Sequence, residues 1–98
     1  MPTKGQPKPQ KIVEKKFVIN NKLGLHARPA ALFVQTANKF NSEIEVRKGR
    51  QKVNGKSIMG IMMLAAGVGT PITVRITGDD AELAMTELSN LIENNFGE

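Results

Sequence analysis

The sequence predicts an α+β domain in which helices cover one face of a β-sheet and the elements follow the order βαββαβα. Short segments alternate apolar and polar residues, as half-buried strands do. Other segments repeat their apolar residues at helical spacing. One pair of alternating segments is joined by a short turn, which indicates a hairpin rather than a helical crossover. The polar alternates favour a second sheet face that is more exposed to solvent.

The first strand and the first helix are predicted from residues 13–41. Residues 13–20 combine β-branched and aromatic residues and end in two asparagines, as an opening strand does. A glycine-containing loop, residues 23–26, follows, and Pro29 suits the first turn of a helix, which tolerates a missing N–H. The helix continues through apolar residues at helical spacing and closes at residues 38–41. These apolar residues are Ala30, Phe33, Val34 and Ala37.

A hairpin and a short second helix come next. Residues 43–47 alternate cleanly, residues 48–50 resemble a turn, and a return strand follows over residues 51–53. After the Asn54-Gly55 break, Ser57 stands where an N-cap residue belongs, which predicts a short helix over residues 58–64. Residues 67–71 end this helix.

The last strand and the last helix have the clearest patterns. Residues 72–77 alternate strictly and stop at Gly78. Asp79 followed three residues later by Glu82 resembles a capping box, so a final helix is expected after it. Its apolar stripe consists of Ala81, Ala84, Met85, Leu88, Leu91 and Ile92. The side chains assigned to the core from these two elements are Ile72, Val74, Ile76, Leu88 and Leu91.

Length and charge divide the chain into a tail and one domain. The 98 residues carry a formal net charge of +5, and residues 1–16 account for +4 of it, so the rest is nearly neutral. Residues 1–11 are rich in proline and lysine, which predicts a disordered basic tail, with the domain at residues 12–98. The tail has no aromatic residue on which bases could stack, so we expect no nucleic-acid partner.

Composition excludes several classes of chemistry. There is no cysteine and only one histidine, so intrachain zinc is improbable, and we expect no metal and no cofactor.

The longest mostly apolar stretch, residues 58–69, is well short of the roughly 20 residues that span a bilayer, so no membrane insertion is expected. The amino-terminal segment has no apolar core of a secretory signal. We therefore expect a cytoplasmic protein.

The single histidine is the candidate for chemistry. His26 precedes the first turn of a predicted helix, where free backbone N–H groups and the positive end of the helix dipole favour an anion. Arg28 adds a guanidinium for the same anion. Because a neutral imidazole is also a good nucleophile near neutral pH, His26 could accept a phosphoryl group itself. A lone histidine is more often an ordinary surface or core residue, so position alone does not decide between these readings.

Two motifs favour the phosphoryl-acceptor role of His26, because they resemble the motifs of a known family. Residues 24–30 (GLHARPA) and residues 56–60 (KSIMG) closely resemble the signatures of HPr, the histidine-containing phosphocarrier family of the bacterial sugar phosphotransferase system. The resemblance runs from about Lys16 to the end of the sequence. It implies an open-faced β-sandwich in which a four-stranded antiparallel sheet carries three helices on one face.

The resemblance also implies roles for residues. His26 would accept the phosphoryl group on Nδ1 from Enzyme I and pass it to Enzyme II A components, as a carrier rather than an enzyme. Arg28 and the backbone N–H of Ala27 would stabilise that group. Ser57 would be the target of HPr kinase/phosphorylase in lineages that have this enzyme, and otherwise only an N-cap. The docking surface for partners would be formed by Ile58, Met59 and Met62, which could instead belong to the core.

Three alternatives to a sugar phosphocarrier stay open, two within this resemblance and one outside it. The fold and the histidine serve both sugar uptake and regulatory relays, such as nitrogen-related or carbon catabolite control. A regulatory interaction protein whose output is set at Ser57 would not need His26, and family members built in that way lack the histidine. A small domain that binds RNA or DNA through the tail would show affinity that falls steeply with salt. We further expect a monomer. Its complexes with partners should be short lived, because a carrier that visits several partners needs small, weak interfaces.

Overall fold

The computed structural model describes residues 11–98, so the predicted tail lies outside the described residues except for Lys11. The elements in chain order are β1 (Ile12–Val18), α1 (Ala27–Ala37), β2 (Glu43–Lys48), β3 (Gln51–Asn54), α2 (Ile58–Met63), β4 (Pro71–Thr77), α3 (Ala81–Glu93) and the 3-10 helix η1 (Asn95–Gly97). The order βαββαβα is confirmed, and η1 is an addition that the sequence analysis did not predict.

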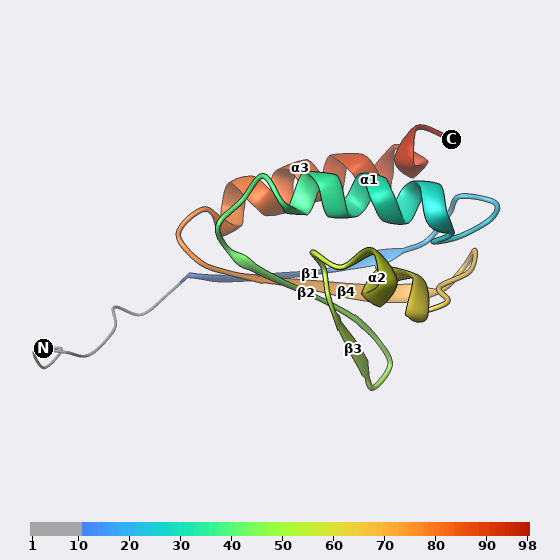
Figure 1. The fold of residues 1–98 in the computed structure, drawn as a ribbon, viewed down its shortest axis with the longest axis horizontal. Helices are drawn as coiled ribbons and strands as arrows, with labels where there is room; N and C mark the ends of the chain where they lie inside the picture. The colour runs from blue at the N-terminus through green and yellow to red at the C-terminus, as the bar shows by residue number, and fades with distance from the viewer. Residues whose placement is uncertain (1–10) are drawn as a thin grey trace, which may run out of the picture.

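The four strands form one sheet in the order β1-β4-β2-β3, and all neighbouring strands are antiparallel. Figure 1 shows α1 and α3 side by side over one face of this sheet. The remaining helix, α2, packs against α1 and β3. The predicted fold class, an open-faced sandwich with a four-stranded antiparallel sheet, is therefore confirmed.

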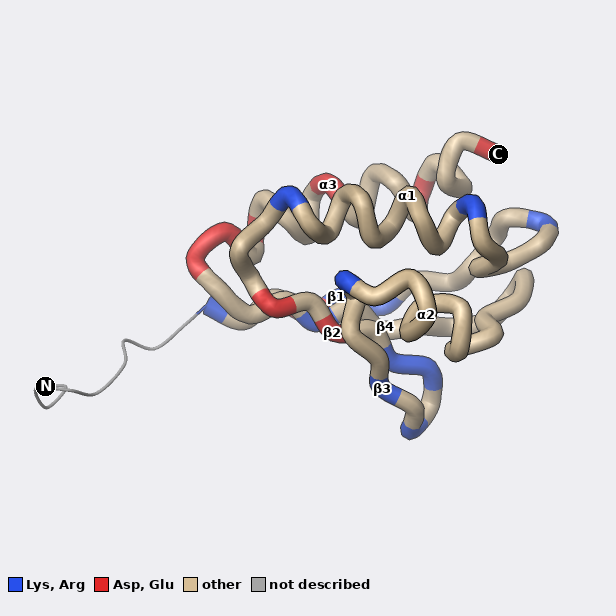
Figure 2. The backbone as a smooth tube through the Cα atoms, viewed as in Figure 1, with Lys and Arg blue, Asp and Glu red and all other residues tan. Residues whose placement is uncertain are grey.

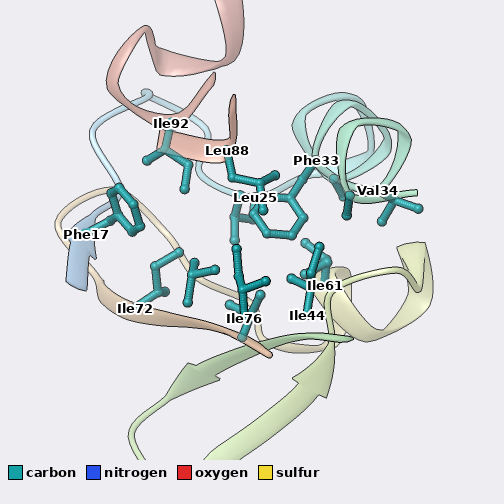
Figure 3. Close-up of a cluster of buried hydrophobic side chains, with 14 of the residues drawn as sticks. Phe17, Leu25, Phe33, Val34, Ile44, Ile61, Ile72, Ile76, Leu88 and Ile92 are labelled. Carbon is teal, nitrogen blue, oxygen red and sulfur yellow. The ribbon is translucent and has the colours of Figure 1, made fainter. Parts of the chain in front are cut away.

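The core lies between the helices and the inward face of the sheet (Figure 3). Alternation along β4 buries Ile72, Val74 and Ile76 while the residues between them face away. Leu88 of α3 is completely buried, as predicted. Leu91 is only partly buried and packs against the margin of the cluster, so its assignment to the core was too strong. Its position on the helix explains this, because a stripe as wide as the predicted one leaves its edge near solvent.

The predicted capping box at the start of α3 is wrong. The N-cap residue is Asp80 rather than Asp79, and its side chain makes no bond to the helix. Instead, the Asp80 carboxylate accepts hydrogen bonds from the backbone N–H of Asn41 at 2.8 Å, from the backbone N–H of Ser42 at 3.0 Å and from the Ser42 hydroxyl. Asp80 thus ties the start of α3 to the turn that precedes β2, a contact with no local sequence signal.

This tie makes part of the stability depend on pH. The Ser42 hydroxyl, and after it the Asn41 N–H, lower the pKa of Asp80 because both donate to the charged carboxylate. Because this pKa is lower in the folded than in the unfolded protein, the ionised carboxylate stabilises the fold. This stabilisation is complete above the unfolded pKa of about 3.9 and is lost as the pH falls through the folded pKa. We therefore expect Asp80→Asn to lower the urea midpoint at pH 7 and to lower it less as the pH falls below about 4. The exposed neighbour Asp79 offers the matched control, Asp79→Asn, and equal losses in both variants would contradict the assignment.

Two further features bear on function. Every helix between residues 11 and 98 is too short or too polar to cross a bilayer. Within the same residues, no three His, Cys, Asp or Glu side chains gather where they could hold a metal ion.

Candidate functional site

The candidate site begins with a loop that is tied to the segment before β4. Residues 19–26, here called the site loop, connect β1 to α1. Ile19 donates its N–H to Thr70 O at 3.0 Å and accepts at its carbonyl oxygen from Gly69 N at 2.6 Å. Leu25 donates its N–H to Ala66 O at 2.9 Å. These bonds extend the β1–β4 pairing and fix the loop on the segment that follows α2.

Gly24 allows the close approach that these bonds need. Its φ is +68°, and a Cβ atom at this position would lie 2.5 Å from Ala66 O and 2.7 Å from Gly67 Cα. The buried Asn21 donates from Nδ2 to Gly24 O at 2.7 Å. The next residue, Leu25, is buried in the core cluster with Phe33 (Figure 3). The backbone on the amino-terminal side of His26 is therefore firmly held.

His26 is the N-cap residue of α1. Its backbone is extended (φ −81°, ψ −171°), its carbonyl oxygen accepts from Ala30 N at 3.0 Å, and its side chain makes no cap bond. The first N–H groups of a helix have no acceptor inside it, so those of Ala27 and Arg28 are available to an anion. Pro29 has no N–H to leave unpaired. The predicted relation between His26 and the helix start is thus observed, although α1 begins at Ala27, three residues earlier than its predicted apolar stripe.

The imidazole is held from one side by Glu98. His26 Nε2 lies 3.0 Å from Glu98 Oε2, and Glu98 Oε1 accepts a second hydrogen bond from Asn21 Nδ2 at 3.1 Å. An ionised carboxylate can only accept, so Nε2 is the donor in this bond, and in the neutral imidazole Nδ1 then keeps its lone pair. The His26 side chain retains 35% of its exposure. This arrangement leaves Nδ1 as the nitrogen that can act as a nucleophile.

Sequence reasoning missed Glu98, which lies 72 residues from His26 in the chain. The contact depends on the turn of η1, where Asn95 and Phe96 both have positive φ values, 54° and 56°. Phe96 is buried and anchors this turn against the core cluster. No spacing rule connects such a turn to a distant loop.

Two cationic side chains, Arg28 and Lys22, lie near the same helix end as the Glu98 carboxylate. Arg28 is exposed two residues after His26, and a shallow pocket beside it is also lined by Lys22, Leu23 and Glu98. The structure thus places His26, Ala27 and Arg28 at one helix terminus, with the guanidinium free of any hydrogen bond or ion pair in the part of the chain that is described. An anion bound at this helix terminus would meet helix N–H groups and a cation.

Ser57 is the N-cap residue of α2, as predicted. Its side-chain oxygen accepts from Gly60 N at 3.0 Å, and its own backbone is extended. The residue is half-buried. Its hydroxyl therefore has a structural role whether or not it is also modified.

The apolar residues of α2 differ in burial. Ile61 is buried, whereas Ile58, Met59 and Met62 are 44%, 70% and 40% exposed. We call these three residues the docking patch. Their exposure favours docking over the core reading. Three further apolar residues that the sequence analysis did not single out, Leu23, Met63 and Val68, are also exposed.

A backbone hydrogen bond connects the loop that carries His26 to the segment that follows the docking patch. The N–H of Leu25 is bonded to Ala66 O, and Ala66 lies three residues after the end of α2. Helices α1 and α2 are also packed against each other (Figure 1). Fold and site together define a small α+β protein that presents a single histidine at the N-terminus of a helix, beside an exposed apolar patch.

Comparison with known proteins identifies this class. The family model described as "PTS HPr component phosphorylation site" matches residues 13–94. The phosphocarrier protein HPr of Xylella fastidiosa is 51% identical over 87 residues, which cover 89% of this chain and 98% of that protein. The HPr-like protein Crh of Halalkalibacterium halodurans is 54% identical over 82 residues, 84% of this chain and 98% of that protein. The chain therefore belongs to the HPr family of phosphocarrier proteins.

Solved structures agree with this assignment. A crystal structure described as HPr-C-His from Thermoanaerobacter tengcongensis has a TM-score of 0.85 and 56% sequence identity, and covers 88% of this chain and 97% of its own. A second structure from the same organism, described as an HPr dimer, has a TM-score of 0.72 and 57% identity, with 84% and 94% covered. A dimer among these neighbours weighs against the expected monomer, so the oligomeric state does not follow from family membership.

Proposed function

We propose that this protein carries a phosphoryl group on His26 from Enzyme I to an Enzyme II A component. The observation that carries the proposal is the hydrogen bond between His26 Nε2 and Glu98, because it leaves Nδ1 as the free nitrogen at the start of α1. Family membership supports the phosphocarrier chemistry, and the named partners belong to the proposal.

The transfer follows from the geometry of the free nitrogen. The Nδ1 lone pair attacks the phosphorus atom held by Enzyme I, a P–N bond forms on His26, and the bond from phosphorus to the donor group breaks. The proton on Nε2 stays in its hydrogen bond to Glu98, which offsets the charge that develops on the imidazole. The N–H groups of Ala27 and Arg28 and the Arg28 guanidinium stabilise the incoming oxygens. Onward transfer is the reverse of this step on the acceptor.

The exposure of the site suits a carrier rather than a catalyst. A carrier must hold the phosphoryl group without stabilising it so strongly that transfer stops. One helix terminus and one exposed guanidinium provide that moderate stabilisation. The partners supply the rest of each active site, so the protein alone should turn over no substrate.

The test uses the protein with phosphoenolpyruvate, magnesium and a catalytic amount of Enzyme I from a related bacterium. We expect one acid-labile phosphoryl group by intact mass, with ¹⁵N shifts of the imidazole that assign it to Nδ1. Adding an Enzyme II A component should then remove the group. A folded protein that stays unmodified beside an Enzyme I that labels its own HPr would overturn the proposal.

The docking patch is the proposed contact surface for both partners. Methionine side chains adapt to different partner surfaces, and a six-residue helix with one buried apolar side chain leaves the others available. Small contacts of this kind allow the fast release that a carrier needs.

Ser57 is the proposed site of a second, regulatory phosphorylation. A phosphate there would place about two negative charges next to the docking patch and so weaken partner binding. HPr kinase/phosphorylase with ATP should add one acid-stable phosphoryl group to the protein and none to Ser57→Ala. The same variant should lose about 1 kcal/mol of unfolding free energy, because Gly60 N loses its acceptor. Labelling of Ser57→Ala at the same rate would show that another residue is the target.

A regulatory role rather than sugar transport is the second candidate. Its support is the similarity to proteins named HPr-like protein Crh, of which the Bacillus subtilis member is 45% identical over 82 residues. The presence of His26 favours the carrier. A nitrogen-related relay and the expected cytoplasmic location stay predictions that acceptor identification and cell fractionation would test.

A further inference from the structure

Charge is distributed unevenly along the part of the chain that builds the docking side. Residues 46–78 span 33 positions and contain six basic residues but no Asp or Glu. These residues include β3, α2 and β4. Figure 2 shows basic positions concentrated on the β2–β3 hairpin, whereas acidic positions lie on β2 near its start, on the loop before α3 and on α3. The hairpin is thus a positive projection beside the docking patch.

The register of the hairpin decides which of its cations face the docking patch. Val46 pairs with Val53 and is buried on the helix side of the sheet. Lys48, two residues further along β2, therefore lies on that same side, since strand side chains alternate. Lys52, which pairs with Arg47, lies on the opposite, open face.

The open-face cation Arg47 is already paired. Its guanidinium lies 2.8 Å from Glu14 and 3.8 Å from Glu45. In contrast, neither Lys48 nor Arg50 forms an ion pair within residues 11–98. Arg50 is exposed in the turn between the two strands. Lys52 on the open face also forms no ion pair within these residues, so Lys48 and Arg50 are the unpaired hairpin cations on the helix side and at the tip.

A direct bond joins the hairpin to α2. Gln51, the partner of Lys48 in the sheet, donates from Nε2 to Met63 O at 3.1 Å. Met63 is the last residue of α2 and is 65% exposed. This bond holds the end of the hairpin that carries Lys48 next to the exposed end of α2.

We propose that Lys48 and Arg50 form a second docking element, which binds carboxylates that flank the apolar contact surface of a partner protein. The inference rests on the proposed phosphocarrier function and adds a partner chemistry to it. An acidic protein surface fits better than nucleic acid, because residues 47–52 include no aromatic residue for base stacking and adjoin an apolar patch. Attraction between such surfaces acts mainly on the association rate.

The test compares two double charge reversals in the full chain. Lys48→Glu/Arg50→Glu reverses the proposed element. Lys16→Glu/Lys52→Glu makes the same change in net charge on the open face, where both lysines are exposed. The initial rate of phosphorylation by limiting Enzyme I is measured at low salt and at about 1 M salt, where the Debye length is about 3 Å. We expect kcat/KM at low salt to fall roughly tenfold in the first variant and less than about twofold in the second, with both differences vanishing at high salt.

The possible results separate the two proposals. Equal losses in the two variants would assign the effect to net charge and overturn the hairpin element. A wild-type protein that accepts no phosphoryl group would overturn the carrier function, and the inference with it. The acidic-protein reading also fails if a fluorescent single-stranded oligonucleotide binds the wild type but not Lys48→Glu/Arg50→Glu, while their phosphorylation rates agree.

Discussion

Replacing His26 by alanine should abolish phosphoryl transfer to this protein, with the rate falling at least about a thousandfold, to the detection limit. The loss is expected because the substitution removes the only imidazole in the chain, which is the nucleophile of the proposed transfer. The folded structure should survive, since the His26 side chain caps no helix and is partly exposed. Initial rates with Enzyme I and the far-ultraviolet circular dichroism spectrum would be measured together.

Arg28 provides the graded comparison within the same experiment. Arg28→Ala should accept the phosphoryl group roughly ten- to a hundredfold more slowly, because it loses one electrostatic donor and keeps the nucleophile. Arg28→Lys should recover only part of the rate, since an ammonium group has no planar fork of donors. Lys22→Ala removes a nearby charge from the exposed pocket and serves as the control.

The His26 prediction has its own contradicting result. A His26→Ala protein that still gains an acid-labile phosphoryl group would exclude His26 as the acceptor.

Gly24→Ala should be the most destabilising small substitution in the site loop, at about 3 kcal/mol of unfolding free energy. Two costs add at this position. An alanine at positive φ costs about 1–2 kcal/mol, and the new methyl group would also press on the backbone of Ala66 and Gly67. Backbone atoms cannot move aside as a flexible side chain can, so the pairing of the site loop with the segment after α2 would have to shift.

Gly49→Ala is the matched control for that prediction. Gly49 also has a positive φ, +59°, but a Cβ atom there would have nothing within 4 Å. It should therefore cost only about 1 kcal/mol. Urea denaturation of both variants separates the steric cost from the conformational one. Similar losses in both would mean that the close approach at Gly24 contributes little.

Local sequence patterns were sufficient to predict most of the helices and strands. The alternation of Ile72, Val74 and Ile76 predicted β4 because one face of the sheet is buried and the other is exposed. Ser57 was recognised as an N-cap because its partner, Gly60, lies only three residues away. Sequence periodicity carries such information directly, since each of these contacts is set within one element.

Contacts between distant segments were not predictable in this way. The sequence analysis assigned the cap of α3 to Asp79, whereas Asp80 is the N-cap residue and bonds to Asn41 and Ser42 across the domain. Glu98 was missed because its contact with His26 depends on a turn at Asn95 and Phe96. The candidate site was recognised through His26 and Arg28, which are neighbours in the chain, while the group that holds the imidazole comes from the opposite end of the described fold.

The order of strands also sets the order in which the protein can be completed during synthesis. The β2–β3 hairpin can close once Asn54 has left the ribosome, because its two strands are adjacent in the chain. The first strand must wait for β4, which begins at Pro71, before it gains a partner. Glu98 reaches His26 later still. A nascent chain therefore exposes the apolar residues of α2 before Glu98 can hold the imidazole of His26, so the contact that orients the histidine forms after the sheet has its strands.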